Sequence, residues 1–452
     1  MHANVVVRRL FCQQKSVILP PKHNIIAMKK NYFFLCLAVF ALSLTSCNKE
    51  LFDQEQYDEL VDNQFMIDNA DPKHDWCLTK NDTILVRTTE AIIYKVQVLT
   101  KNPYIHTDSE IASEGVCYGN QAGLTYTVPL DQRVIYIAAL DQDDNYLGVV
   151  PVTMGTKELD LLVSMLQKST TFTPPTYQTF SYLYESTFPI PDDFDYNDMV
   201  MRITKSYTNI STEVLLTVAL TAAGTANPYA AAIHLGGVKY DDVMSVEILD
   251  GDPMDEGYSF QRSLITQSGT LIKGRNGEAV IRLFEHVHWV FNKQLTDMGA
   301  IEGIKYNTSH EVKEHVSAEI DPVVRTFRIT CKTREVARSI TFDRIDPFLV
   351  CNTKYDQVMD AGIWEIHTYQ YKFTGILRDC FTDKNAYDNH VSWALVIPKG
   401  DFRYPLEGVS MCTYQKEIDA TFGPYEGFAN WLKSHLTNHD WYLHVTREQL
   451  LY

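Results

Sequence analysis

The stretch FSYLYE at residues 180–185, followed by PDDFDYNDMVM at residues 191–201, combines the two features that decide how this chain folds. Its two ends are rich in aromatic and apolar side chains, which is typical of buried β-strands. Between them, residues 191–198 carry four carboxylates and one amide. Acids this close to apolar strands repel one another unless a cation lies among them. The loop is therefore the strongest candidate for a binding site.

The acidic loop has the residue types and the spacing of a calcium site. Calcium binds six to eight hard oxygens, which alternate residues of an irregular loop can supply. The loop lacks the glycine and the final glutamate of an EF-hand. It also offers no open position or nearby nucleophile for catalysis, so we expect a structural Ca²⁺, the alternative being a solvated acidic turn. The predicted ligands are Asp193, Asp195 and Asn197, which alternate, together with Asp192, Asp198 and Glu185.

The beginning of the chain has the pattern of a bacterial lipoprotein signal. Lys29-Lys30 precede an apolar run over residues 32–44, and small residues lead to Cys47. The run is too short for a permanent membrane span, which takes about 20 residues. We therefore predict a signal peptide over residues 1–46 and lipidation of Cys47. Met28 is the expected start, which makes residues 1–27 a mis-called extension.

The net charge of the mature chain disfavours some classes of binding partner. From Cys47 onward there are 34 Lys and Arg against 57 Asp and Glu, a net charge of −23. Such a chain disfavours nucleic acid and anionic membrane surfaces, both of which attract clustered basic residues. Membrane attachment would instead come from acyl chains on Cys47. Asn48 is not the Asp that retains many lipoproteins in the inner membrane, so we expect the outer membrane and the cell surface.

Strand patterns divide the rest of the chain. Residues 47–70 are acidic and read as a lipid-anchored tether. Short β-branched and aromatic runs over residues 71–156 predict an immunoglobulin-like β-sandwich. Asp141–Asn145 has alternate carboxylates, but turn geometry alone explains them. Leucines over Glu158–Gln167 predict a helix within a helical linker at residues 157–179, which Pro174-Pro175 ends.

Residues 180–452 again have strand patterns. We expect a larger, jelly-roll-like β-sandwich, so that the fold class is mainly β. One short helix is predicted near the end, after Gly423-Pro424, with Phe428, Trp431, Leu432 and Leu436 on one face.

Other metal and redox motifs are weak. Cys77, Cys117, Cys331, Cys351, Cys380 and Cys412 contain no CxxC pair, which disfavours zinc. A Cys77–Cys117 disulfide and a set of free thiols explain the cysteines equally well. His310 and His315 are five residues apart, one too many for the zincin motif. His286 and His288 would share a strand face, but no third ligand is evident.

Further segments follow in a fixed order: Tyr184-Glu185, Asp193–Val200, Ala222–Gly224, His234–Val238, Asp346–Phe348, Trp393–Pro398, Phe402–Pro405, Phe428–Trp431 and Asp440–Tyr442. Over residues 180–445 this ordered set resembles the LruC domain of Bacteroidetes surface lipoproteins. The resemblance implies a surface-exposed module whose acidic signature binds calcium, and it implies no activity. Ser186-Thr187-Phe188 depart from the usual opening of this domain, which makes Glu185 the least secure of the ligands.

Two functions follow as hypotheses. The first is a calcium-stabilised binding or structural module of the cell envelope, with a glycan or a protein as its ligand. The alternative is a surface enzyme that acts on polysaccharide through a carboxylate pair that the sequence does not reveal. No GxSxG, Walker or dinucleotide motif is present, and no catalytic constellation is recognised.

Overall fold

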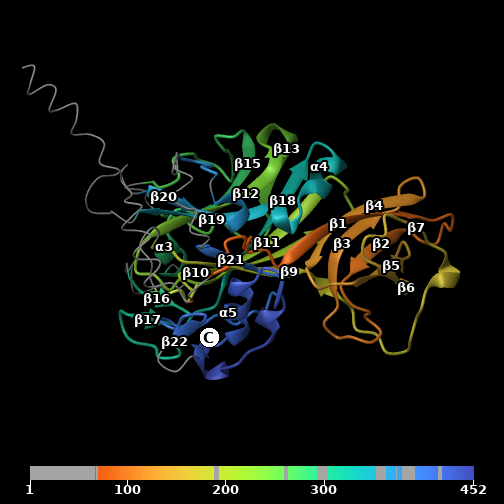
Figure 1. Ribbon diagram of the computed structural model, residues 1–452. Helices are drawn as coiled ribbons and strands as arrows, with labels where there is room; N and C mark the ends of the chain where they lie inside the picture. The colour runs from red at the N-terminus through yellow and green to blue at the C-terminus, as the bar shows by residue number, and fades with distance from the viewer. Residues whose placement is uncertain are drawn as a thin grey trace, which may run out of the picture. The chain divides into compact units, whose positions relative to one another are not determined.

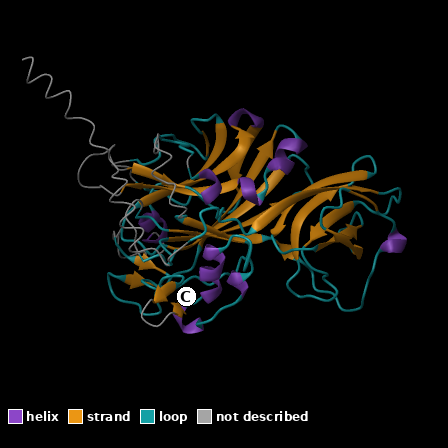
Figure 2. Cartoon of the chain, in the orientation of Figure 1, coloured by secondary structure: helices purple, strands orange, loops and turns teal. Residues whose placement is uncertain are grey.

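The computed structural model of the chain describes residue 67 and residues 70–187, 193–258, 263–292, 303–352, 363–372, 374–378, 392–415 and 420–452. The predicted signal peptide, Cys47, most of the predicted tether and Asp192 lie outside these ranges. Within them strands dominate, which confirms the mainly β fold class (Figure 2). The α-helices of these ranges are short: α3 (Val287–Asn292), α4 (Arg334–Ser339) and α5 (Glu426–Lys433). Of the described helices, none has the length and hydropathy that a membrane span requires.

The first sandwich packs a three-stranded sheet on a five-stranded one. A core that includes Ile84, Val96, Tyr126 and Ile137 lies between the two sheets. The first sheet has the order β4 (Gln121–Pro129), β1 (Thr79–Arg87), β7 (Glu158–Asp160). The second has the order β6 (Tyr146–Thr153), β5 (Val134–Leu140), β2 (Lys95–Leu99), β3 (Glu110–Val116), β8 (Thr176–Tyr177).

The second, larger sandwich is built from a six-stranded and a five-stranded antiparallel sheet (Figure 1). The six-stranded sheet has the order β13 (Val243–Ile248), β18 (Val323–Cys331), β11 (Glu213–Ala222), β10 (Met199–Tyr207), β9 (Thr179–Tyr184), β21 (Ala394–Ile397). The five-stranded sheet has the order β14 (Leu271–Lys273), β15 (Glu278–Phe284), β12 (Tyr229–Lys239), β19 (Ile345–Asn352), β20 (Ile363–Ile366). Two small ribbons accompany them: β16 (Lys305–Tyr306) with β17 (Ser317–Ala318), and β22 (Thr413–Gln415) with β23 (Ala420–Phe422).

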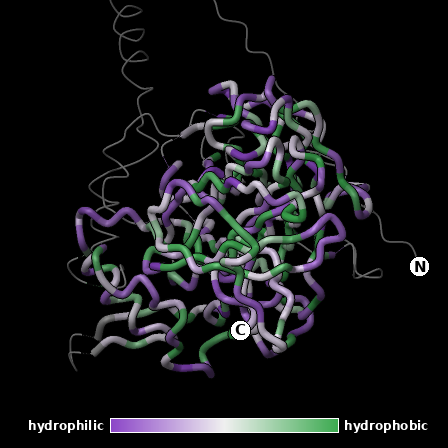
Figure 3. Tube along the Cα trace, turned by 90° about the vertical axis from the view of Figure 1, so that its right-hand side faces the viewer, coloured by the Kyte–Doolittle hydropathy of each residue, from purple (hydrophilic) through white to green (hydrophobic). Residues whose placement is uncertain are grey.

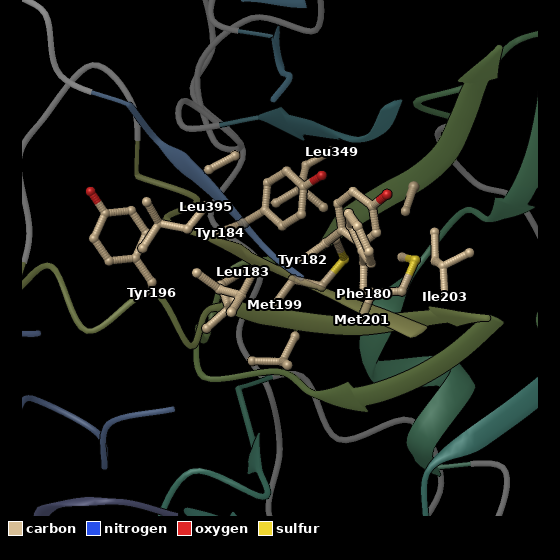
Figure 4. Packing of buried hydrophobic residues seen from close by; sticks show 14 of the residues in the cluster. Phe180, Tyr182, Leu183, Tyr184, Tyr196, Met199, Met201, Ile203, Leu349 and Leu395 are labelled. Atoms are coloured by element: carbon tan, nitrogen blue, oxygen red, sulfur yellow. The ribbon is translucent and has the colours of Figure 1, made fainter. Parts of the chain in front are cut away.

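Strand β9 shows why the aromatic run is buried. Side chains alternate across a strand, so Tyr182 and Tyr184 share one side while Leu183 takes the other (Figure 4). The two tyrosines point toward β19 of the opposite sheet, and the Tyr184 hydroxyl donates to Pro347 O. Each ring therefore fills the core while its hydroxyl is hydrogen-bonded, which removes the cost of burying that group. Along the chain, apolar segments gather in the interior and hydrophilic ones form outer loops (Figure 3).

A segment before the first strand belongs to the core of the larger sandwich. Ile67, Trp76 and Leu78 are buried in that core, although the sequence analysis places them in the tether and the small sandwich. Asp71 N donates to Leu432 O of α5 over 2.8 Å. The Trp76 ring meets the ring of Trp431, also on α5, edge to face at 5.7 Å. We call residue 67 and residues 70–78 the N-terminal strap.

Two detailed expectations are wrong, those for the helix over Glu158–Gln167 and for Leu436, and of the two alternatives for Cys77 and Cys117 the free thiols are found. The helix predicted over Glu158–Gln167 is replaced by β7 and a 3₁₀ turn at Val163–Met165, because Leu161 is buried in the small sandwich beside β1. Cys77 and Cys117 are free thiols. Helix α5 is confirmed, but it ends at Lys433, and Leu436 is 72% exposed instead of lying on its buried face. The Asp141 turn is confirmed, since Asp141 Oδ1 accepts hydrogen bonds from the backbone of residues 143 and 145.

Candidate metal site

The β9–β10 pair positions the first two acids. Met199 pairs with Tyr184, so Glu185 directly follows β9 and Asp198 directly precedes β10 at the same end of the sheet. Glu185 N donates to Trp393 O, which holds the start of the loop against the segment before β21. Both acids are buried, with exposed fractions of 1% and 8%. The two carboxylates therefore sit where the sheet ends and the hydrogen-bonded ladder no longer fixes the backbone.

The loop between them holds an unusual backbone. Phe194 and Tyr196 both have φ of 54°, in the left-handed region, which costs an L-residue roughly 1–2 kcal/mol. Their side chains compensate because both are buried, and the Tyr196 hydroxyl donates to Ser392 O over 2.8 Å. With the two aromatic residues anchored in the core, the intervening acids form a separate polar cluster.

Three of the predicted ligands converge. One carboxylate oxygen each from Glu185, Asp193 and Asp195 lies within 4.8 Å of the others. Backbone N–H groups fix the orientation of two of these carboxylates, since Glu185 Oε1 accepts from Tyr196 N at 2.6 Å and Asp195 Oδ1 accepts from Asn197 N at 2.9 Å. In the same way, Asp198 Oδ2 accepts from Ser186 N at 2.6 Å. The carboxylates are preorganised rather than splayed into solvent.

A fifth carboxylate arrives from a distant segment that the sequence analysis missed. The approach of Glu407 to the loop is fixed because the next residue, Gly408, donates its N–H to Asp195 Oδ2 over 2.9 Å. Glu407 also pairs with Lys305 of β16. More than 200 residues separate Glu407 from the loop, and no local pattern marks it as a ligand. We call Glu185, Asp193, Asp195, Asp198 and Glu407 the acid cluster.

Asn197 presents an unused oxygen to this cluster. The residue is fully buried and its Nδ2 donates to Pro405 O over 3.1 Å, yet its Oδ1 has no hydrogen-bond partner among the described residues. A Cβ on Gly224 would overlap that oxygen and would lie 3.0 Å from Glu407 Oε2. Glycine at position 224 thus leaves room beside two acceptor oxygens from different segments. A buried acceptor without a donor is the ligand type that a cation uses.

Burial and mutual repulsion disfavour the ionised form of the carboxylates in the acid cluster. Burial raises the pKa of Glu185 and of Asp195, and the neighbouring carboxylates raise both further. Burial likewise raises the pKa of Asp198 to about 7 and also raises that of Glu407. Although burial opposes it, pairing with Glu407 raises the pKa of Lys305. Five carboxylates beside one such ammonium would gain from a further cation, and an oxygen-only donor set fits calcium.

A second buried acidic group, also missed in the sequence, is built differently. His234 on β12 and His367 after β20 both direct Nδ1 at Asp346 Oδ2, at 3.2 and 2.7 Å. Their Nε2 atoms face Glu278 at 2.5 Å and Glu365 at 3.0 Å. We call these five residues the histidine–carboxylate chain. Although burial opposes it, Asp346 and Glu365 raise the pKa of His367 to about 9, so a charged imidazole separates two of the acids.

The other histidines singled out in the sequence do not join a cluster of this kind. His286 and His288 lie at the start of α3 rather than on a strand, with ring centroids 5.6 Å apart. His310 Nε2 contacts Leu451 O at 3.1 Å, whereas His315 is exposed. Asp192 lies outside the described residues.

Comparison with known proteins places most of the larger sandwich in one family. Residues 209–442 match the family described as "Domain of unknown function (DUF4842)", a match that begins after the acidic loop and includes Lys305 and Glu407. No curated protein matches the chain in sequence.

Two solved structures were compared. The chain is similar to one described as a "Putative lipoprotein from Bacteroides ovatus", with 19% identity over 80% of this chain and 99% of that one and a TM-score of 0.49. The full-length major pilin SpaD from Corynebacterium diphtheriae gives 9% identity over 64% of this chain and 66% of that one, with a TM-score of 0.13. Nothing about function follows from either likeness.

Proposed function

Because the chain belongs to the family "Domain of unknown function (DUF4842)", whose description assigns no activity, we propose a function from the site itself. We propose that the larger sandwich is a calcium-stabilised module of a lipid-anchored envelope protein, and that it serves as a binding or structural unit. The observation that carries this proposal is the convergence of three carboxylates beside the unpartnered Oδ1 of Asn197.

The choice of calcium rests on the donor atoms. The acid cluster and Asn197 offer oxygens alone, which excludes the sulfur and imidazole sites that zinc and copper prefer. Magnesium demands a near-ideal octahedron and keeps several waters, whereas calcium accepts more protein oxygens in irregular geometry. An irregular loop with carboxylates from several segments suits the larger ion.

The ion would act by joining parts of the fold. Its ligands would come from the end of β9, from the loop before β10 and from the segment at Glu407. The alternative to the ion is protonation of the acids, which their raised pKa values favour, so calcium would have to displace those protons. Calcium that binds the folded chain and not the unfolded one adds about 2.7 kcal/mol of stability at 100 times Kd.

The lipid anchor enters this proposal from the sequence. A basic pair, a short apolar run and Cys47 have the order of a lipoprotein signal. The resemblance of residues 180–445 to the LruC domain supports the same location for the protein, the surface of an outer membrane. Its ligand there would be a glycan or a protein.

Thermal unfolding of the purified chain carrying Cys47→Ser tests the metal. We expect a calcium chelator to lower the Tm and excess calcium to restore it, with magnesium less effective. Asp195→Asn removes one charge at nearly constant volume. Since a buried acid repels its neighbours without the ion and binds it when present, the variant should unfold at a higher Tm than the parent in chelator and at a lower Tm in calcium.

The matched control is Asp143→Asn, in the exposed Asp141 turn, which should leave both transitions where the parent has them. A parent whose Tm is the same in chelator and in calcium would refute the metal site. A variant that loses stability equally in both conditions would show that Asp195 acts only through its hydrogen bonds.

A further inference from the structure

A small pocket lies where the two sandwiches meet. It is lined from the smaller sandwich by β3 and β4, and from the larger one by the end of β10, the β10–β11 turn and α4. Helix α4 packs against β4, and the Tyr207 hydroxyl of β10 donates to Ala112 O of β3 over 3.3 Å. Two lining residues, Tyr118 and Ile210, are 44% and 55% exposed. The pocket is therefore a defined recess that stays open to solvent.

Lys205 brings an ammonium without a counter-charge to this pocket. The residue lies on β10, is only 4% exposed and lines the pocket. Its Nζ lies 5.0 Å over the ring of Tyr207. No acceptor of the described residues is within hydrogen-bonding or ion-pairing distance of this atom, which is nevertheless not fully buried. Because a ring stabilises a desolvated ammonium only in part, Lys205 favours an anion in the pocket.

Arg338 on α4 brings a second cation of this kind. Its guanidinium lies against β4, since a Cβ on Gly123 would be 3.5 Å from Nη1. The described part of the chain gives Arg338 no hydrogen bond and no ion pair, and the nearby Glu335 pairs with Arg334 instead, at 2.8 Å. Burial and the charge of Arg334 lower the pKa of Arg338, although Glu335 opposes them. Two cations thus line one small space without partners.

The two acids that line the pocket already have cations of their own. Glu114 Oε1 of β3 lies 3.5 Å from Lys95 Nζ. Glu213 Oε2, at the start of β11, lies 3.9 Å from Arg328 Nε. Neither of these cations lines the pocket. The charge that remains uncompensated in the pocket is therefore that of the lysine and the arginine described above.

The size and the charge of the pocket select the ligand. Its volume is about 40 Å³, far below the range of about 300–1,000 Å³ for small-molecule sites. One water needs about 10–15 Å³, so there is room for a group of roughly three or four oxygens. A double negative charge matches the two cations, and charge-assisted hydrogen bonds to such oxygens are strong. We propose that this pocket binds a doubly charged tetrahedral oxyanion, as inorganic phosphate or as the phosphate end of a larger ligand, with Lys205 and Arg338 as its counter-charges.

The oxyanion would lie between the two sandwiches. Lys205 and Arg338 belong to the larger one, whereas Ser113 and Thr125 of the smaller one line the same pocket. A phosphate group accepts hydrogen bonds from ammonium, guanidinium and hydroxyl donors alike. The pocket contains none of the expected calcium ligands, so this inference and the proposed calcium site can fail separately.

The test is calorimetric titration of the chain carrying Cys47→Ser with inorganic phosphate, without calcium and at constant ionic strength. The titration is run at about pH 8, where phosphate is doubly charged. We expect saturable binding, which sulfate competes for and acetate does not. Lys205→Gln and Arg338→Gln should each weaken phosphate binding about tenfold or more, because each removes one charge-assisted contact. Lys205→Arg keeps the charge and should retain more of the affinity than Lys205→Gln.

The matched controls are Lys313→Gln and Arg87→Gln. Both cations are exposed and pair with a glutamate away from the pocket, so these variants should keep the parent affinity. Thermal unfolding without phosphate checks that the pocket variants fold. Since each of them removes a cation without a partner, their Tm should not fall below that of the parent.

Glycerol phosphate distinguishes the two sources of the group. Binding of both phosphates would support a pocket that takes the end of a larger ligand, and binding of inorganic phosphate alone would support a free ion. A parent that binds no phosphate would overturn the inference, as would affinities that both glutamine variants retain. Acetate that binds as tightly as phosphate would also overturn it, because a single charge would then suffice.

Discussion

The acid cluster and the histidine–carboxylate chain differ in how they offset the charge of buried carboxylates. Both bury several carboxylates within one sandwich. In the histidine–carboxylate chain, His234 and His367 alternate with the acids, so each carboxylate faces an imidazole nitrogen. In the acid cluster, backbone N–H groups and Lys305 offset the charge only in part, and Asn197 Oδ1 remains unused. A buried acid group with imidazoles between its carboxylates needs nothing further, whereas one without them has the composition of a metal site.

The largest expected effect comes from breaking the self-sufficient group. His367→Leu leaves Asp346 and Glu365 buried with no charge between them, so we expect a loss of about 3–5 kcal/mol in the free energy of unfolding. Denaturant unfolding measures it. The control is His444→Leu, whose histidine is exposed beside Asp440 and should change stability by less than about 0.5 kcal/mol. A loss below about 1 kcal/mol for His367→Leu would mean that the histidine–carboxylate chain does not stabilise the fold as a unit.

The pH dependence separates the two groups. The pKa of His367 rises to about 9 in the fold from an ordinary value of 6.5. Its contribution is therefore complete below pH 6.5 and disappears as the pH rises through 9, an amount on the order of 3 kcal/mol. Unfolding measured between pH 6 and 10 should show this loss equally in calcium and in chelator. A loss that calcium abolishes would assign the titration to the acid cluster instead.

A smaller effect is expected at the carboxylate that the sequence did not reveal. Glu407→Gln keeps the shape of the side chain and removes one charge beside the loop. We expect calcium to bind about tenfold more weakly, a change of about 1.4 kcal/mol, with little effect on unfolding in chelator. Calcium titration of the unfolding transition gives the affinity. The comparison variant is Glu448→Gln, whose glutamate is exposed beside Arg403 and should leave the affinity unchanged. Equal affinities for Glu407→Gln and the parent would exclude Glu407 from the site.

The smallest effect is expected at Lys305. Its side chain is 32% exposed, and its ammonium would compete with a bound ion for Glu407. Lys305→Met should therefore tighten calcium binding severalfold and should lower the Tm in chelator by removing a counter-charge, each effect below about 1 kcal/mol because solvent screens the pair. The same calcium titration measures both. Weaker binding in this variant would show that the lysine organises the site rather than competing for it.

The sequence predicted what local patterns determine. Aromatic and apolar runs located β9 and β10, and the spacing of Asp193 and Asp195 marked the loop before the fold was known. Glu407 and His367 could not be predicted, because each meets its partners through strand order and not through sequence spacing. The helix predicted from the leucines of residues 158–167 was wrong for a related reason. Leu161 is buried because β7 pairs in parallel with β1, and local sequence periodicity does not reveal that pairing.

The N-terminal strap has a mechanical consequence. Asp71 and His74 hydrogen-bond to α5, and Trp76 is wedged among its aromatic rings before the chain enters β1. A pulling force applied before the strap therefore acts first on the contacts between the strap and the hydrophobic core of the larger sandwich. Only after those rings have been pulled from α5 does the load reach β1 and begin to peel the smaller sandwich. A pull on the chain before the strap would therefore be borne first by the sandwich that holds the acid cluster.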